Sequence, residues 1–254
     1  MYQQIQYIKF LLKSTNQHGV HSPFVYELVT KCFYDKTRSP EYTLLKSYKN
    51  TLLKNNQTIE ITDLGSGSKI SSSNLRTVKS IAKHSGTSLK RAKLLFRLSN
   101  YFKFQYILEL GTSLGIATQA IHLGNPKSQI TSIEGCPNIS NTTKLNLHDS
   151  KNIKLLVGDF DSQIDTLEQD SFDFVFFDGN HNKEATLRYF EKLLTKTHNE
   201  TLFIFDDIYW SKDMTEAWET IKKHPKVSVT IDTFFWGFVF FRKEQVKEDF
   251  VIRL

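Results

Sequence analysis

Residues 105–115 read Gln-Tyr-Ile-Leu-Glu-Leu-Gly-Thr-Ser-Leu-Gly, an apolar run that carries one acid, Glu109, and ends in a turn with glycines at Gly111 and Gly115. A helical apolar pattern follows at residues 116–123. A strand that ends in a glycine turn and leads into a helix offers backbone N–H groups and the positive end of a helix to a nucleotide-like ligand. The stretch therefore predicts an α/β fold with a ligand site at the turn.

The spacing of these glycines argues against a dinucleotide. A dinucleotide fingerprint is G-x-G-x-x-G, in which the second glycine lets a pyrophosphate approach the backbone, but Ser113 occupies that position here. The pattern that remains, E-x-G-x-x-x-G, resembles motif I of the class I S-adenosylmethionine-dependent methyltransferases. The resemblance implies that Glu109 lies near the ammonium group of the cofactor and that Gly111, Ser113 and Gly115 bind it.

Two further strand ends extend this cofactor site. A second short strand ends in Glu134, about twenty residues beyond the glycines, where a carboxylate can accept both ribose hydroxyls. A third strand, residues 153–157, leads into Gly158-Asp159-Phe160, which resembles the adenine-side loop of the family. Asp159 is then expected near the exocyclic amine, with Phe160 against the ring. The alternative is that Asp159 is only a turn residue.

Strands and helices alternate from Gln105 onward. Strands are predicted at residues 106–110, 130–134, 153–157, 172–177 and 202–205, with helices near 116–123, 138–148, 183–195 and 212–223. Such alternation implies a parallel sheet with helices on both faces. Two β-rich runs, 227–233 and 236–242, lie so close together that they favour an antiparallel hairpin. The pattern resembles the doubly wound, seven-stranded, Rossmann-like sheet of the methyltransferases.

The chemical site is predicted at the carboxyl ends of the fourth and fifth strands. The fourth strand delivers Asp178 and, three residues later, His181, and the fifth delivers Asp206 and Asp207 to the same edge of the sheet. Three carboxylates at one point would repel one another unless a cation lies between them, and oxygen ligands suit Mg²⁺. The alternative is that Asp207 caps the following segment and Asp206 pairs with a lysine.

These strand ends resemble those of the metal-dependent O-methyltransferases of the catechol and caffeoyl-CoA type. The resemblance assigns Asp178, Asp206 and Asp207 to the metal, with aspartate at the last position, where that type usually has asparagine. His181 stands where the catechol type carries a catalytic lysine, and it matches the histidine base of the macrolide-sugar O-methyltransferases. A histidine can take a hydroxyl proton near neutral pH, so the expected catalytic residues are His181 and Asp178. Alternatively, His181 simply sits in a turn.

Residues 1–104 are predicted to form an all-helical N-terminal extension. Helical spacing covers residues 2–13, Ser22 and Pro23 form an N-cap and first-turn pair, and residues 88–104 form a basic amphipathic helix. Residues 36–56 are expected to be loop with one short helix. The expected domains are therefore a lid or substrate region, 1–104, and an S-adenosylmethionine-binding catalytic domain, 105–254.

A second glycine-rich stretch, residues 58–68, reads Thr-Ile-Glu-Ile-Thr-Asp-Leu-Gly-Ser-Gly-Ser and looks much like another strand and glycine loop. It lacks the downstream series of strands, and no ribose acid follows at the right distance. We interpret residues 60–70 as a loop near the active site that acts as a lid, or else as a plain connector.

Charge, cysteine content and hydropathy limit the classes of protein to which the chain can belong. The chain has 254 residues and a formal net charge of +6, but residues 1–106 carry 17 Lys+Arg against 5 Asp+Glu, and residues 107–254 carry 16 against 22. The basic half fits an acidic partner or a plain lysine-rich surface. The two cysteines lack metal-ligand spacing, and no stretch approaches the roughly 18 apolar residues of a membrane span, so a cytoplasmic protein with reduced thiols is expected.

The sequence thus predicts an O-methyltransferase that uses S-adenosylmethionine, with the assistance of Mg²⁺, on a hydroxyl of a small molecule. Tyr209, Trp210 and Trp236 lie near strand ends and are expected either to wall the acceptor or to belong to the core. One alternative is an RNA methyltransferase that uses the basic half, although no arginine-rich or aromatic-interleaved nucleic-acid module appears. The other is a nucleotide-binding protein without chemistry. The sequence also leaves a homodimer open.

Overall fold

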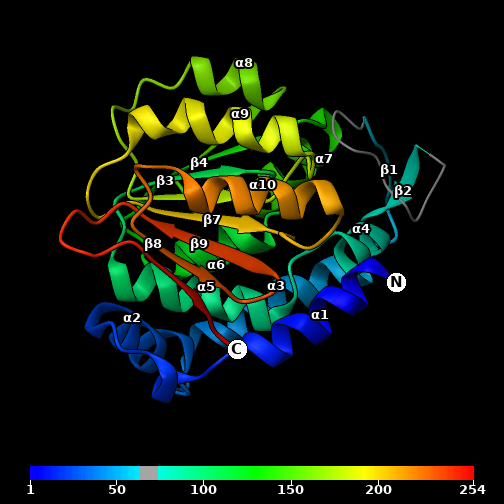
Figure 1. Cartoon of the computed structure of the whole chain (residues 1–254). Helices are drawn as coiled ribbons and strands as arrows, with labels where there is room; N and C mark the ends of the chain where they lie inside the picture. The colour runs from blue at the N-terminus through cyan, green and yellow to red at the C-terminus, as the bar shows by residue number, and fades with distance from the viewer. Residues whose placement is uncertain (63–73) are drawn as a thin grey trace. The chain divides into compact units, whose positions relative to one another are not determined.

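The computed structural model of the chain describes residues 1–62 and 74–254, which form two compact units (Figure 1). One unit comprises residues 35–166, and the other joins residues 1–34 to residues 167–254. The α/β class is confirmed, because the described strands include a mostly parallel sheet of eight strands. The expected number was seven. The predicted lid at residues 60–70 lies largely outside the described residues.

The unit of residues 35–166 holds the strand that decides the fold. Its elements are α3 (Glu41–Lys54), β1 (Thr58–Glu60), β2 (Leu75–Thr77), α4 (Val78–His84), α5 (Leu89–Phe102), β3 (Tyr106–Leu110), α6 (Ile116–Gly124), β4 (Gln129–Glu134), α7 (Pro137–Asn146), β5 (Ile153–Val157) and α8 (Phe160–Asp165). β3, β4 and β5 pair in parallel, and their register places Glu109 opposite Ser132. The three strands therefore end at one edge, as predicted.

Local chemistry explains where α5 and α6 begin and end. The Ser88 side chain accepts a hydrogen bond from the backbone N–H of Arg91 and so caps α5, which ends at Lys103 in a left-handed conformation. α6 is apolar almost throughout, and Ile116, Ala120 and Ile121 are all buried. Figure 1 shows α5 and α6 lying close together, and the two helices are in direct contact. A helix buried on several sides needs this apolar composition.

The expectation of an all-helical region before residue 105 is wrong in one respect. β1 and β2 form a small antiparallel pair in which Thr58 lies opposite Thr77. α3, expected to be short, runs from Glu41 to Lys54. The start of the 58–68 stretch, which resembles a strand in sequence, does form β1, but its partner β2 lies beyond residues 63–73. Such non-local pairing is not visible in local periodicity.

The second unit contains the predicted chemical site. Its elements are α1 (Tyr2–Lys13), η1 (Gln17–Gly19), α2 (Pro23–Leu28), a π-helical turn η2 (Val29–Phe33), β6 (Phe174–Phe177), α9 (Lys183–Leu193), η3 (Leu194–Lys196), β7 (Leu202–Asp206), α10 (Lys212–Lys223), β8 (Val229–Asp232), β9 (Trp236–Phe240) and β10 (Glu248–Val251). The side chain of Ser22 caps α2 and Pro23 opens it, as predicted.

The sheet order in this unit is β10-β8-β9-β7-β6. β6 and β7 are parallel, β9 is antiparallel to both β7 and β8, and the predicted β8–β9 hairpin is confirmed. β10 adds an eighth strand that pairs in parallel with β8. It follows from these pairings that β6, β7, β8 and β10 run in the same direction, so their carboxyl ends lie at one edge.

Aromatic side chains fill the core of this unit. β6 and β7 are buried along their length, as strands covered on both faces must be, and the rings of Phe177 and Phe205 stack with centroids 4.2 Å apart. Figure 1 shows α9 and α10 side by side over the strands. Trp218 of α10 packs so tightly on β9 that a Cβ added at Gly237 would lie 2.6 Å from its ring.

The start and end of the described chain meet within this unit. Thr15 and Ile252 form a parallel bridge, and the backbone N–H of Thr15 donates to the carbonyl of Val251. Phe10 of α1 is buried, and its ring lies 5.6 Å from that of Phe234. α1 and α2 therefore pack with the β6–β10 strands, whereas α3, α4 and α5 belong to the other unit.

Candidate functional site

The turn after β3 adopts the backbone geometry that its glycines allow. Gly111 has φ 105° and Gly115 has φ 72°, and Ser113 between them has φ 47°. These left-handed conformations favour glycine, and they explain why two glycines punctuate the sequence at this point. The turn ends at Gly115, where α6 begins. Its backbone thus presents the start of a helix to the edge where β3, β4 and β5 end.

Glu109 is the buried acid of this turn. It has no exposed surface, and its Oε2 accepts hydrogen bonds from the hydroxyls of Thr118 and Ser132, each at 2.5 Å. Its Oε1 is buried and has no hydrogen-bond partner among the residues that the structure describes. Burial raises the pKa of Glu109 to about 7, and the two hydroxyls offset part of that rise. A buried carboxyl oxygen without a partner is costly, so this one is suited to receive a ligand's N–H group.

Glu134 ends β4 beside the same turn. Its Oε2 accepts from the backbone N–H of Ser113 at 2.8 Å, and its Oε1 accepts from the backbone N–H of Cys136 at 2.9 Å. These bonds connect the second strand end to the glycine turn. Each carboxylate oxygen of Glu134 therefore holds a different backbone N–H at this edge of the sheet. The structure thus brings Glu109, Ser113 and Glu134 together, and the ribose role of Glu134 stays a prediction.

Asp159 has a local structural role. It caps α8, because its carboxylate accepts from both the backbone N–H and the hydroxyl of Ser162 at 2.9 and 2.7 Å. Those bonds lower the pKa of Asp159, whose side chain is exposed. Such capping is consistent with the alternative that Asp159 is a turn residue. A contact with adenine stays a prediction.

The chemical site begins where β6 and β7 end. Phe177 and Phe205 are paired in register, so Asp178 and Asp206, which follow them, lie at the same edge of the sheet. Asp206 is buried, and its Oδ1 accepts from the backbone N–H of Asp207 at 2.8 Å. The predicted placement of these two carboxylates at neighbouring strand ends therefore agrees with the pairing of the strands.

The predicted meeting of three carboxylates is not found. Among the described residues, no group of three or more His, Cys, Asp and Glu side chains is placed to hold a metal ion. Asp207 has φ 54°, so the chain leaves its extended course directly after Asp206. Neighbouring residues on a strand point to opposite faces, and this turn alters the direction again. Two consecutive acids in a sequence therefore need not reach one point.

His181 follows a left-handed residue, Asn180, with φ 49°. The Asn180 amide donates to the Tyr189 hydroxyl at 2.9 Å, and Asn182 caps α9 by accepting from the backbone N–H of Ala185. The residues on both sides of His181 are thus fixed to α9. Its ring is partly exposed and lies 6.5 Å, centroid to centroid, from that of Trp210. The left-handed Asn180 agrees with the alternative that His181 sits in a turn. The role of His181 as a base stays a prediction.

The three aromatic residues expected at the acceptor differ in their surroundings. Trp236 is buried and lies edge-on to Phe176, so it belongs to the core. The hydroxyl of Tyr209 donates to Oδ2 of the buried Asp232 at 2.5 Å, and burial raises the pKa of that carboxyl. The Trp210 ring lies near that of His181, and its contact with an acceptor stays a prediction.

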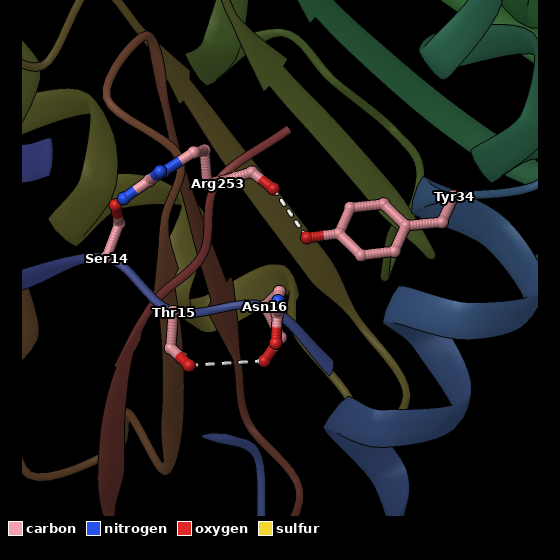
Figure 2. A pocket seen from close by; sticks show the side chains of 5 residues that line it. All are labelled: Ser14, Thr15, Asn16, Tyr34 and Arg253. Atoms are coloured by element: carbon pink, nitrogen blue, oxygen red, sulfur yellow. Dashed lines mark hydrogen bonds between the residues drawn. The ribbon is translucent and has the colours of Figure 1, made fainter. Parts of the chain in front are cut away.

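A separate cavity of about 300 Å³ is lined by Ser14, Thr15, Asn16, Tyr34 and Arg253 (Figure 2). The Arg253 guanidinium donates to the Ser14 hydroxyl and to the carbonyl of Leu11, and the Tyr34 hydroxyl donates to the Arg253 carbonyl. These polar groups satisfy one another, and they join the segment after α1 to the segment after β10. We interpret the cavity as a gap between chain segments.

Sequence reasoning missed Thr118 and Ser132, the hydroxyls that hold Glu109. One signal was available, because Glu109 lies two residues before Gly111 and Ser132 lies two residues before Glu134. Each residue lies three positions after the first residue of its strand, Tyr106 or Gln129, so the parallel register places the two side by side. Thr118 is similarly marked as a polar residue in an apolar helix.

The fold and the glycine turn define an α/β protein with the class I methyltransferase architecture. Residues 108–208 match the model of a family described as methyltransferase domain. This part of the chain is therefore a methyltransferase domain, and the methyltransferase class expected from the motifs is confirmed. No curated protein sequence matches the chain significantly. The comparisons favour neither of the alternative functions.

Solved structures share this fold at low sequence identity. A methyltransferase of Podospora anserina with S-adenosylhomocysteine bound has a TM-score of 0.63 and 13% identity, covering 88% of this chain and 97% of its own. An O-methyltransferase of Bacillus cereus in complex with S-adenosylhomocysteine has a TM-score of 0.52 and 22% identity, covering 61% and 81%. An O-methyltransferase of Streptomyces achromogenes, involved in tomaymycin synthesis and bound to S-adenosylmethionine, has a TM-score of 0.52 and 20% identity, covering 61% and 80%.

Among the described residues, no helix is long and apolar enough to cross a membrane.

Proposed function

We propose that the protein transfers a methyl group from S-adenosylmethionine to a hydroxyl of a small molecule. The observation that carries the proposal is the turn after β3, where the unpartnered Oε1 of Glu109 and the carboxylate of Glu134 lie beside left-handed glycines. The similar folds solved with S-adenosylmethionine or S-adenosylhomocysteine support the choice of cofactor.

The residues of the turn fit the chemical groups of this cofactor. Glu109 would accept from its ammonium group, and Glu134 would accept from its ribose hydroxyls. Gly111, Ser113 and Gly115 would shape the backbone around it, and Asp159 would lie on the adenine side. S-adenosylmethionine supplies a methyl group that its sulfonium already activates. The protein's main contribution would then be to position the acceptor and to remove its proton.

The ends of β6 and β7 supply groups for the acceptor. His181 would take the proton of the acceptor hydroxyl, and the neighbouring Trp210 ring would contact the acceptor. Asp178 and Asp206 would hold Mg²⁺, with Asp207 nearby. Two carboxylates are enough for this choice, because Mg²⁺ usually binds one or two of them and keeps several waters. The ion would acidify a hydroxyl bound to it.

Calorimetry with S-adenosylhomocysteine tests the cofactor. We expect binding to the full chain and its loss in Glu134→Ala. Glu168→Ala is the matched control, because Glu168 is exposed and outside the glycine turn, and it should bind like the wild type. Absence of binding to the wild type would overturn the proposal.

Methyl transfer to a panel of hydroxylated acceptors tests the chemistry. We expect EDTA to lower turnover and added Mg²⁺ to restore it, and we expect Asp178→Asn to raise the Mg²⁺ concentration required. His181→Gln should lower kcat and leave S-adenosylhomocysteine binding unchanged. If EDTA leaves turnover unchanged, the three aspartates have structural roles and the reaction does not use Mg²⁺.

A further inference from the structure

Two side chains that the motif does not include hold the cofactor turn from outside. The hydroxyl of Tyr48, on α3, donates to the carbonyl of Leu114 at 2.8 Å, and the hydroxyl of Thr143, on α7, donates to the carbonyl of Ser113 at 2.7 Å. Consecutive carbonyls of the turn are therefore fixed by two different helices. Neither helix is part of the strand–turn–helix unit formed by β3 and α6.

The packing around Gly115 shows how closely these side chains approach the turn. A Cβ added at Gly115 would lie 2.8 Å from Cγ2 of Thr143 and 3.0 Å from the hydroxyl oxygen of Tyr48. Gly115 also has φ 72°, a conformation that side chains disfavour. The missing side chain at Gly115 thus gives Tyr48 and Thr143 access to the backbone of the turn.

The surroundings of the Tyr48 hydroxyl connect it to the buried acid of the site. Burial raises the pKa of Tyr48, and the negative charge of Glu109 raises it further, so the hydroxyl remains protonated. A neutral tyrosine hydroxyl has one O–H to donate, and the Leu114 carbonyl accepts it. Removing this hydroxyl would leave a carbonyl of the turn without its partner.

We propose that Tyr48 and Thr143 are positioning residues that hold the Ser113–Gly115 turn in the conformation that binds the cofactor. The inference rests on the proposed function. It assigns to α3, within the region expected from the sequence to be a lid or substrate domain, a part in cofactor binding. A left-handed residue such as Ser113 persists only where its surroundings fix it, and these two hydroxyls supply part of that constraint.

Affinity for S-adenosylhomocysteine, measured by calorimetry, tests the proposal. We expect Tyr48→Phe and Thr143→Val each to weaken binding about fivefold to tenfold, because a carbonyl left without its partner costs roughly 1 kcal/mol or more. Thr143→Ser, which keeps the hydroxyl, should restore most of the affinity. Two controls should bind like the wild type: Tyr42→Phe, on the same helix α3, and Thr142→Val, whose hydroxyl bonds to the Asn138 carbonyl within α7.

A second readout separates positioning from a general loss of stability. In the free protein, the amide resonances of Ser113, Leu114 and Gly115 should shift in Tyr48→Phe, whereas those of the β3–β5 strands should not. If both variants bind like the wild type, the inference is wrong although the proposed function stands. If the wild type itself does not bind, the proposed function fails. Should Tyr48→Phe fail to fold, Thr143→Val and Thr143→Ser decide the question.

Discussion

Replacing Glu109 by glutamine should change how the stability of the protein depends on pH. The Glu109 side chain has no exposed surface, and within residues 1–62 and 74–254 its Oε1 has no hydrogen-bond partner. Burial raises its pKa from the ordinary 4.5 to about 7 in the folded protein. Between these two values, the unfolded chain has lost the proton and the folded protein still binds it.

The sign follows from this difference in bound protons. Where the folded state binds more protons than the unfolded state, the free energy of unfolding falls as the pH rises. The stability is therefore fully present below about pH 4.5 and is lost as the pH rises through about 7. Each unit of pKa corresponds to about 1.36 kcal/mol, so the whole loss is about 3 kcal/mol. A glutamine at position 109 has no titrating proton, so the free energy of unfolding of the variant should not show this loss.

Urea denaturation of the Glu109→Gln variant and the wild type at pH 5 and pH 7.5 provides the measurement. We expect the stability of the variant relative to the wild type to rise by about 2 kcal/mol between the two pH values, since part of the loss has already occurred at pH 5. Glu168→Gln, at an exposed position, should show no such change. An equal difference at both pH values would refute the reasoning, because it would mean that Glu109 titrates normally in the fold.

Three further outcomes follow from the same structure. If Glu109 must be ionised to accept an ammonium group, affinity for S-adenosylhomocysteine should weaken by up to tenfold for each pH unit below about 7, and calorimetry should find this slope absent in Glu109→Gln. Gly115→Ala should lower the free energy of unfolding by about 1–2 kcal/mol through its left-handed φ alone, and should abolish binding because its Cβ would displace Thr143. Gly237→Ala should lower stability by about 1–3 kcal/mol in urea denaturation, because its Cβ would lie 2.6 Å from the Trp218 ring, and unchanged stability would show that this ring can move.

The sequence predicts most strongly those features that depend on local pattern. The runs 106–110 and 153–157 coincide with β3 and β5, because short apolar segments bounded by turn residues indicate strands. The turn after β3 could also be predicted from the sequence, since Gly111 and Gly115 take positive φ values that glycine adopts without strain. The pairing of Glu109 with Ser132 follows once the strands are known to be parallel.

Features that depend on distant contacts could not be predicted in the same way. β10 is short, half exposed and charged at its start, so nothing in residues 248–251 distinguishes it from a loop until β8 is present to pair with it. The hydroxyl of Tyr48 reaches the cofactor turn across 66 positions of sequence. The course of the chain after Asp206 depends on the left-handed conformation of Asp207, which the apolar pattern of the strand does not predict.

The residues of the N-terminal third are divided between the two compact units of the structure. α1 and α2 pack in the same compact unit as His181, Trp210 and the ends of β6 and β7. α3, α4 and α5 pack in the unit that contains the glycine turn. α1 and α2 belong to the unit that holds His181 and Trp210, so we propose them as candidates for acceptor specificity. Substitution of Tyr48 in α3 should instead change cofactor affinity, because its hydroxyl bonds directly to the turn.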